Sequence, residues 1–418
     1  MVDLLIIKAS QIATLNSVYG VPRIGNEMQE LGLIHNGAIA IKDEIIMEVG
    51  ETNKILSKYD VKNNESVIDA SGKLITPGFV DPHTHIIFAG SRENELEMKL
   101  KGKTYLEILE DGGGILKSVR ATRNASLDTL VQNGTQILDT MLKYGTTTVE
   151  TKTGYGLTTE DEIKSLKTIR KLNQTHPIDV IATFMGAHAI PPEYKNHPEE
   201  YVRLIIKEMI PKVSEMKLAE FCDVFCEEGI FSIEESRRIL KTGQKYELIP
   251  QIHIDEIVDT NGAQLAAELD VSQAGHLLKS NLKGLKAMAK KKIIATLLPG
   301  TPFCLMQNDY APARSMINLG IPIALSTDLN PNCWTESMQM IITLACYEMG
   351  LTPAEALAAS TLNSACALKR DNIIGSLEKG KKADINIFDV PNYQFLAYHF
   401  GVNLVSKVIK NGKIVVEN

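Results

Sequence analysis

Residues 75–85, which read Ile-Thr-Pro-Gly-Phe-Val-Asp-Pro-His-Thr-His, decide the fold prediction for this chain. A Pro-Gly turn leads into a short apolar run that ends in His-x-His. Residues two apart on a strand point to the same side, so His83 and His85 project together from a strand end. Two neutral imidazoles on one side suit zinc or iron. Taken alone, such a pair is more often two polar residues that end a strand than a metal site.

Length and composition indicate a globular protein of ordinary make-up. The 418 residues leave room for one large domain and a smaller one. Hydrophobic residues make up 44% and charged residues 23%, which is typical of globular chains. The formal net charge of −7 argues against a nucleic-acid or membrane-surface binder. An anionic substrate would therefore need a local cation to hold it.

The cysteines and the N-terminal segment predict a cytoplasmic location. The six cysteines are scattered without a paired metal spacing, and so few thiols over this length suit a reducing compartment. The first eight residues have no basic lead, and their apolar run is too short for a signal peptide. No apolar run approaches the roughly 18 residues of a membrane span.

The middle of the chain, residues 78–376, alternates short apolar runs with helical patterns. This alternation is typical of β/α units around a parallel sheet, and a TIM-like (β/α)8 barrel is the fold that we predict. The eight strand candidates are Phe79–Val80, Thr146–Glu150, Asp179–Phe184, Asp223–Phe225, Pro250–Ile254, Gln273–Ala274, Ile293–Leu298 and Ile321–Ser326.

The two ends of the chain, residues 1–77 and 377–418, have a β character. Apolar runs over residues 37–42 and 45–50 flank Asp43-Glu44 as a hairpin, and Asn411-Gly412 turns a second hairpin near the C-terminus. Strands at both ends predict one small β-sandwich domain that is built from both termini and closes the chain around the barrel.

Polar residues recur where the predicted barrel strands end, which is where barrel enzymes place their chemistry. A single histidine such as His276 is usually structural, but histidines and acids at most strand ends of one barrel are hard to obtain by chance. In strand order these residues are His83 and His85; Lys152 and Tyr155; His188; Glu227 and Glu228; His253 and Glu256; His276; and Asp328, Asn330 and Asn332.

On this architecture, the set His83-x-His85, His253, His276 and Asp328 resembles the amidohydrolase superfamily, and the resemblance covers nearly the whole chain. Longer strings narrow it to those members that open the ring of 4-imidazolone-5-propanoate with water, giving N-formimino-L-glutamate in histidine degradation. These strings are residues 81–85 with 88–92, 152–157, 184–189, 328–331, 391–393 and 398–403.

The resemblance implies a metal-dependent hydrolase with one divalent or trivalent ion, zinc or iron. His83, His85, His253 and Asp328 would be the ligands, and water activated by the metal would be the nucleophile. Glu256, His276 and Asp328 would be the catalytic groups that hold the water and move its protons. A homodimer is also implied.

Substrate-binding residues carry over from the same resemblance. Arg92 would hold the propionate, because arginine offers a carboxylate a bidentate fork. Tyr155, His188 and Glu256 would contact the ring and its tail, and Asn330 the opened product. Asn332 and Cys333 stand where a glycine and a small hydroxyl residue are expected, so a backbone contact is the expectation there.

Two alternatives share the predicted fold. Another amidohydrolase, such as a cyclic-amidine or guanine-type deaminase, would keep the ligands but not need Arg92, Tyr155 and His188 for a carboxylate tail. A catalytically dead scaffold should have lost ligands, and this chain keeps every one. A bridging carboxylated lysine is disfavoured, because Lys152 follows the second strand, whereas the fourth ends in Glu227 and Glu228. Lys152 is expected to be an ion-pair or substrate-side residue.

Overall fold

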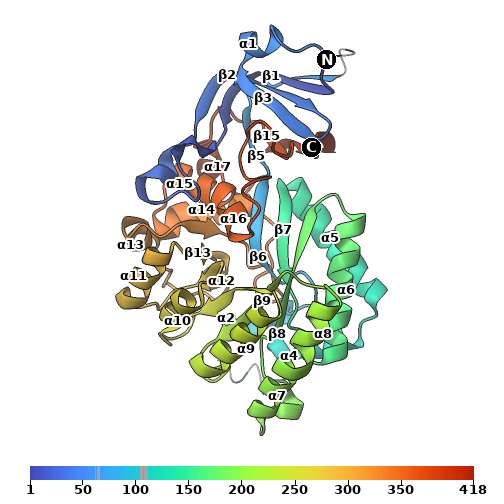
Figure 1. Cartoon of the computed structure of the whole chain (residues 1–418), viewed down its shortest axis with the longest axis vertical. Helices are drawn as coiled ribbons and strands as arrows, with labels where there is room; N and C mark the ends of the chain where they lie inside the picture. The colour runs from blue at the N-terminus through green and yellow to red at the C-terminus, as the bar shows by residue number, and fades with distance from the viewer. Residues whose placement is uncertain (62, 64–65, 104–106, 108–111) are drawn as a thin grey trace.

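The structure is a computed structural model that describes residues 1–61, 63, 66–103, 107 and 112–418. Figure 1 shows two parts, a sheet formed by both ends of the chain at the top and a barrel of strands and helices below it. The strands of the barrel run downward, so that their carboxyl ends face away from the upper sheet.

The lower sheet is the predicted barrel. Its strands pair in parallel in the order of the chain, and each of the eight predicted strands is present. Backbone hydrogen bonds from His85 N to Leu329 O (2.8 Å) and from Asp328 N to His83 O (3.2 Å) join the last strand to the first. The strands are β6 (Phe79–Thr84), β7 (Thr146–Lys152), β8 (Asp179–Ala187), β9 (Phe221–Cys226), β11 (Ile252–Ile254), β12 (Gln273–His276), β13 (Ile294–Leu297) and β14 (Ile323–Leu325), with β10 (Ile249–Pro250) pairing β9 off this path.

Most helices follow the barrel strands and pack on the outside of the barrel, whereas residues 52–56 form a short helix on the upper sheet (Figure 1). Their sequence signals are ordinary: Thr352 and Glu355 form the predicted capping box, and Leu166, Ile169 and Leu172 of α6 turn one apolar face inward. The helices are α1 (Thr52–Leu56), α2 (Glu93–Leu100), α4 (Ile115–Asn124), α5 (Leu127–Lys143), α6 (Thr159–Thr175), α7 (Pro198–Leu204), α8 (Ile210–Glu215), α9 (Ile233–Lys245), α10 (Gly262–Leu269), α11 (Leu282–Lys291), α12 (Gly300–Cys304), α13 (Ala313–Asn318), α14 (Met338–Met349), α15 (Pro353–Ala359), α16 (Leu362–Ala367) and α17 (Phe395–Tyr398).

The upper sheet draws its strands from both termini, as the sequence predicts. Its order is β17-β16-β15-β5-β1-β2-β3, with β4 pairing β1. The C-terminal hairpin turns at Asn411 and Gly412, whose φ angles of 49° and 73° fit a tight hairpin turn. The strands are β1 (Leu4–Ala13), β2 (Leu33–Lys42), β3 (Ile45–Glu51), β4 (Val67–Asp69), β5 (Leu74–Pro77), β15 (Ile385–Phe388), β16 (Val405–Lys410) and β17 (Lys413–Glu417).

The chain crosses from the upper sheet to the barrel at Gly78, between β5 and β6. A Cβ at this position would lie 2.2 Å from the Oγ1 of Thr147, so the crossing needs glycine. The domain boundaries at residues 77 and 376 stay a prediction. Within the described part of the chain, no helix is both long and apolar enough to cross a bilayer.

Candidate active site and metal centre

Three imidazole nitrogens and one carboxylate oxygen converge at the carboxyl end of the barrel. The Nε2 of His253 lies 2.9 Å from that of His83 and 3.4 Å from that of His85. The Oδ1 of Asp328 is 3.8 Å from the Nε2 of His83 and 3.6 Å from that of His85. All four side chains are buried, although they come from three separate strand ends. We call them the His-Asp cluster.

The spacing and the charge of the His-Asp cluster fit one metal ion. Ligand atoms that surround zinc tetrahedrally at ~2.0–2.1 Å lie roughly 3.3–3.4 Å apart, which is within the spread of the distances above. Burial first, then neighbouring positive groups, holds the pKa of His83 and of His85 well below its ordinary value. Both imidazoles are therefore neutral, the form in which histidine binds metals. A ring nitrogen of His276, a ring nitrogen of His83 and a carboxylate oxygen of Asp328 also lie within 4.8 Å of one another.

A buried ion-pair network fixes the orientation of His253. Its Nδ1 lies 3.0 Å from the Oδ1 of Asp223, so the Nδ1–H donates to the carboxylate and the Nε2 faces the cluster. Lys152 donates to the Oδ2 of Asp223 (2.9 Å), to Glu150 (2.9 Å) and to Gln251 (2.8 Å). Burial opposes the charge of Lys152, but the two carboxylates outweigh it and raise the pKa of the lysine. Lys152 is thus an ion-pair residue behind the cluster.

Backbone geometry at the strand ends is unusual beside the cluster. Asp255, His276 and Asp328 have positive φ angles of 52°, 72° and 50°. Such backbone is uncommon for residues other than glycine and is found preferentially at functional sites. Gly275 is required for a different reason, because a Cβ there would lie 2.7 Å from the ring of His83. Tertiary packing therefore holds these side chains in place against local preference.

Asp81 ties the first strand to the end of the last. Its carboxylate, fully buried, accepts hydrogen bonds from the hydroxyl of Ser326 and from the hydroxyl (2.6 Å) and amide (3.2 Å) of Thr327. Burial raises the pKa of Asp81 to about 6 despite these donors. These hydrogen bonds of Asp81 close the barrel next to His83 and Asp328. The Oδ2 of Asp328 accepts a hydrogen bond from the hydroxyl of Thr301.

Glu256 and His276 face each other beside the cluster. The Oε2 of Glu256 lies 3.6 Å from the Nε2 of His276, and the Glu256 side chain is 17% exposed. Burial raises the pKa of Glu256 to about 7, while His253 acts in the opposite direction. Burial also lowers the pKa of His276 to about 4. A carboxyl with a pKa near neutrality can both accept and release a proton.

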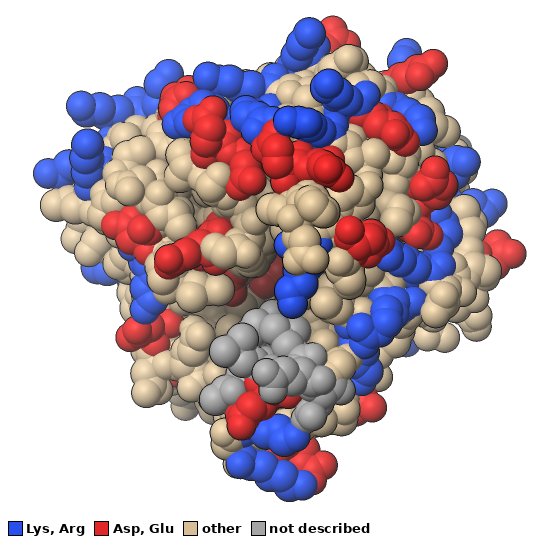
Figure 2. All heavy atoms as spheres, turned by 90° about the horizontal axis from the view of Figure 1, so that it is seen from below, with Lys and Arg blue, Asp and Glu red and all other residues tan. Residues whose placement is uncertain are grey.

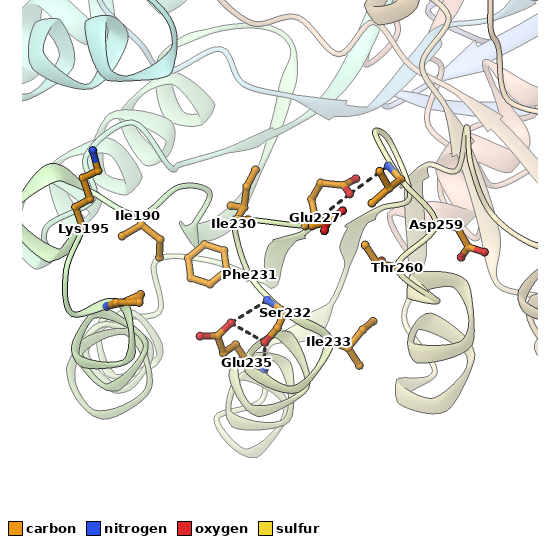
Figure 3. Close-up of a pocket in the computed structure, with 14 residues that line it drawn as sticks. Ile190, Lys195, Glu227, Ile230, Phe231, Ser232, Ile233, Glu235, Asp259 and Thr260 are labelled. Carbon is orange, nitrogen blue, oxygen red and sulfur yellow. Dashed lines mark hydrogen bonds between the residues drawn. The ribbon is translucent and has the colours of Figure 1, made fainter. Parts of the chain in front are cut away.

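Glu227 anchors the loop that carries Glu256. Its carboxylate accepts the amides of Glu256 (3.0 Å), Ile257 (2.9 Å) and Val258 (3.3 Å). Glu227 also lines a pocket of about 700 Å³ between neighbouring loops, where Figure 3 marks its hydrogen bonds. The lining residues of this pocket, all in the described ranges, include no member of the His-Asp cluster.

Tyr155 and His188 form an aromatic wall next to His85. The rings of His188 and His85 stack with centroids 4.9 Å apart, and Tyr155 meets His188 edge-on at 5.2 Å. The Nδ1 of His188 lies 3.1 Å from the carbonyl oxygen of Gly154. Buried Glu162 accepts the amides of residues 156 and 157 and so holds the Tyr155 turn. The structure thus brings both predicted ring contacts to the cluster.

Arg92 is already engaged by a neighbouring acid. Its Nε and Nη2 donate to the two oxygens of Glu95 at 2.9 and 2.7 Å, and the Arg92 side chain is 10% exposed. Glu95 also accepts the amide of Gly114 (2.9 Å). Glu95 therefore occupies part of the guanidinium group that was predicted to bind a carboxylate. The Nη1 atom takes no part in this pair with Glu95.

The loop after β14 places the three remaining predicted contacts differently. The Asn330 side chain donates to the carbonyl of Asp328 (2.7 Å) and accepts the amides of Asn332 (2.8 Å) and Cys333 (3.0 Å). The Oδ1 of Asn332 accepts a hydrogen bond from Lys99 (2.8 Å). Cys333 is fully buried, with its Sγ 3.6 Å from that of Cys304.

The face of the barrel at the carboxyl ends of the strands is hollowed. Figure 2 views the bottom of the molecule as drawn in Figure 1 and shows a depression with acidic side chains inside it and a basic side chain at its edge. This face is where the loops after the carboxyl ends of the strands gather (Figure 1). The depression thus lies on the end of the barrel to which the strands that carry the His-Asp cluster point.

Comparison with known proteins places the chain in a family. Residues 74–415 match the amidohydrolase family. A protein of Alkaliphilus metalliredigens named imidazolonepropionase is 52% identical over 418 residues, which is 100% of this chain and 99% of that one. A protein of Alkaliphilus oremlandii with the same name is 50% identical over 417 residues, covering 100% and 98%. The chain belongs to the amidohydrolase family, among the imidazolonepropionases.

Solved structures show how widely this amidohydrolase fold is shared. A 5-methylcytosine deaminase from Klebsiella pneumoniae superposes with a TM-score of 0.74 at 17% identity, covering 99% of this chain and 98% of the other. The guanine deaminase of E. coli gives a TM-score of 0.71 at 15% identity, covering 99% of each chain. At such low identity these likenesses show the fold, and the relatives at about 50% identity carry the family within it.

Several residues of this amidohydrolase site escaped the sequence prediction. Asp223 lies inside the apolar run 221–226, and a lone acid in a buried strand was a signal that could have been read. Asp81 stands two residues before His83 in the sequence, but the prediction assigns it no role. Thr301 follows the seventh predicted strand, but the sequence does not reveal its hydrogen bond to Asp328. Glu162 and Glu95 gave no local signal, because their partners lie elsewhere in the chain or in turns whose geometry the sequence does not reveal.

Proposed function

We propose that this chain opens the imidazolone ring of 4-imidazolone-5-propanoate with water and releases N-formimino-L-glutamate. The single observation that carries the proposal is the convergence of three imidazoles and one carboxylate beside Glu256, in a chain about half identical over its full length to proteins named imidazolonepropionase. Ring opening breaks the bond between the carbonyl carbon and a ring nitrogen and needs an activated water.

One metal ion per chain, zinc or iron, would be held by His83, His85, His253 and Asp328. When bound, the ion lowers the pKa of water to about 7 and polarises the carbonyl that is attacked. Three imidazoles and a carboxylate suit both metals. Asp223 supports the set by fixing the tautomer of His253.

The protons are moved by groups of the chain. Glu256, with its pKa near 7, accepts a proton from the attacking water and delivers it to the ring nitrogen as the carbon–nitrogen bond breaks. Neutral His276 lies within reach of Glu256 and donates a hydrogen bond to the oxygen that gains negative charge. Asp328 holds the water through one carboxylate oxygen, and the hydroxyl of Thr301 donates a hydrogen bond to the other carboxylate oxygen.

The substrate is oriented by its tail and its ring. Arg92 offers Nη1 to the propionate while Glu95 fixes the rest of the guanidinium. The stacked ring of His188 and the hydroxyl of Tyr155 contact the planar imidazolone. Asn330 shapes the loop whose backbone, at Asn332 and Cys333, faces the opened product. This arrangement separates the function from the deaminase alternative, which needs no anchor for an anionic tail.

Ultraviolet absorbance of freshly prepared imidazolonepropionate tests the reaction. Protein with about one metal per chain should remove the ring chromophore, formiminoglutamate should appear, and prior chelation should stop both. Elemental analysis of the active protein distinguishes zinc from iron. An intact chromophore in the presence of metal-loaded protein would overturn the proposal, and ammonia release from guanine or a cyclic amidine would favour the deaminase alternative.

Two further properties belong to the same proposal. A cytoplasmic location agrees with the six cysteines, all of which are free thiols. A homodimer is the expected assembly, and sedimentation of the purified chain at several concentrations measures it directly.

A further inference from the structure

Lys99 lies on the same helix face as the predicted anion anchor. Helix α2 begins directly after Arg92, and Glu95 and Lys99 follow at the third and seventh positions, so all three share one side of the helix. The Nζ of Lys99 donates to the Oδ1 of Asn332 at 2.8 Å. This contact joins α2 to the loop that follows Asp328.

The charges on this face do not balance. Glu95 is buried and its two oxygens are engaged by Arg92, with the amide of Gly114 as a further donor. Lys99 meets the neutral amide of Asn332 instead, and among the described residues it has no carboxylate within ion-pair distance. Two cations therefore share one anion, which leaves about one uncompensated positive charge in a half-buried place.

The environment of Lys99 agrees with this imbalance. Partial burial, followed by repulsion from the Arg92 guanidinium, lowers the pKa of Lys99. A cation that is desolvated and repelled in this way is stabilised by an anion placed between it and its neighbour. A ligand carboxylate bound between Lys99 and Arg92 would therefore compensate the excess positive charge.

A chain of contacts connects Lys99 to the reacting groups. Asn332 donates its amide to the Asn330 side chain, which in turn donates to the carbonyl of Asp328. Arg92 is close enough to Tyr155 to act electrostatically on that hydroxyl, as Asp328 is. Arg92 thus lies near Tyr155, and Lys99 is linked to Asp328 through Asn332 and Asn330.

We propose that Lys99 is a second substrate-binding cation, and that Arg92 and Lys99 hold one carboxylate of the substrate between them. The inference rests on the proposed function, because it assigns the carboxylate to the propionate tail. Asn332 is the side chain that keeps the ammonium in place. The departure from the expected glycine at this position thereby acquires a role in substrate binding.

Calorimetry with a stable analogue tests the inference without requiring turnover. The probe is 3-(imidazol-4-yl)propanoate, which carries the same tail on an unreactive ring, and its matched neutral form is the carboxamide. In the metal-loaded full chain, Lys99→Met should weaken binding of the acid at least about tenfold and binding of the amide less than about twofold. Lys99→Arg should keep most of the affinity for the acid.

Lys101→Met is the matched control, because Lys101 ends the same helix but pairs with Glu97 at the surface, with both side chains 70% exposed. It should leave the affinity for both probes unchanged. Asn332→Ala frees Lys99 and should give an intermediate loss for the acid. Equal affinities of Lys99→Met and Lys101→Met for the acid would overturn the inference.

The two proposals fail in different ways. If the unsubstituted protein prefers the acid over the amide and Lys99→Met reduces that preference at least about fivefold, the anion site stands even when imidazolonepropionate is not opened. If the ring is opened but Lys99→Met keeps the preference for the acid, the function stands and the role of Lys99 is overturned.

Discussion

Two lysines are buried with carboxylates at opposite ends of the barrel. Lys152, at the carboxyl end of β7, pairs with Asp223 and Glu150 at 2.9 Å each. Lys410, in the upper sheet, pairs with Asp384 (2.7 Å) and with Asp179 (2.8 Å), the first residue of β8. Both ammonium groups are almost fully buried and have raised pKa values.

The difference lies in what the carboxylates do next. The other oxygen of Asp223 accepts a hydrogen bond from His253 of the cluster. The ion pair between Lys152 and Asp223 therefore orients a predicted metal ligand. Asp384 and Asp179 join the upper sheet to the barrel, and Asp384 also accepts the amide of Asn411 in the hairpin turn. Buried ion pairs are weak sources of stability, so each must be explained by what it positions. Here one positions a ligand and the other positions two sheets.

The largest effect is expected at the cluster itself. His253→Ala removes a metal ligand and leaves Asp223 without its partner, so the protein should lose the metal and at least about 10³-fold of its activity. Elemental analysis and the absorbance assay measure both. His399→Ala, at an exposed histidine outside the His-Asp cluster, is the control and should change neither. Full metal content in His253→Ala would remove this residue from the ligand set.

Glu256 sharpens the comparison, because we propose that its carboxyl serves chemistry and not packing. Its pKa is raised to about 7, so below that pH it is protonated and cannot accept a proton from water. The value of kcat/KM should therefore fall as pH falls through about 7. Glu256→Gln should cost about 10²–10⁴-fold and flatten that limb. Exposed Glu228→Gln is the matched control; a limb that survives in Glu256→Gln belongs to another group.

Substituting the two lysines tests the comparison directly. Lys152→Met and Lys410→Met each strand buried carboxylates, so each should lower the free energy of unfolding by about 3–5 kcal/mol. Only Lys152→Met should also weaken metal affinity, by about 10–100-fold, because it disturbs the support of a ligand. Urea unfolding and chelator competition measure the two quantities. A loss of metal affinity of the same size in Lys410→Met would erase the distinction.

The smallest effect is expected at the substrate tail. Arg92→Ala should raise KM about tenfold, because a charged contact to the propionate is lost, while metal content stays intact. Part of the fold also feels the change, since buried Glu95 loses its partner. Arg203→Ala, which removes a surface arginine paired with Glu199, is the control. An unchanged KM in Arg92→Ala would mean that the carboxylate is held elsewhere.

Much of the fold could be predicted because period and spacing are local properties of a chain. All eight barrel strands, both hairpins and the capping box at Thr352 were readable from alternation, turn residues and cap residues. Strand ends of a barrel meet on one face, so the positions of His83, His253 and Asp328 in the sequence were enough to predict that they would gather. The site roles assigned to them stay predictions.

The partners of buried charges could not be predicted in the same way. Glu95, Glu162 and Glu227 resemble ordinary helix or loop acids in sequence, yet each accepts backbone amides of a site loop. Which amide a carboxylate meets depends on loop geometry that no local pattern encodes. For the same reason the sequence did not reveal Glu95 as the partner of Arg92, although the two are only three residues apart.

The sequence by itself determined the barrel, the sheet from both termini and the strand ends at which the four cluster residues stand, because apolar period and strand-end position are written along the chain. The choice of these four among the strand-end residues came from the resemblance to the amidohydrolase superfamily. Only the tertiary structure decided the tautomer of His253, the near-neutral pKa of Glu256 and the split between Lys152 and Lys410. Those properties arise from burial and from contacts between residues such as Asp223 and His253, 30 positions apart, and a charge in a folded interior is governed by what packs against it.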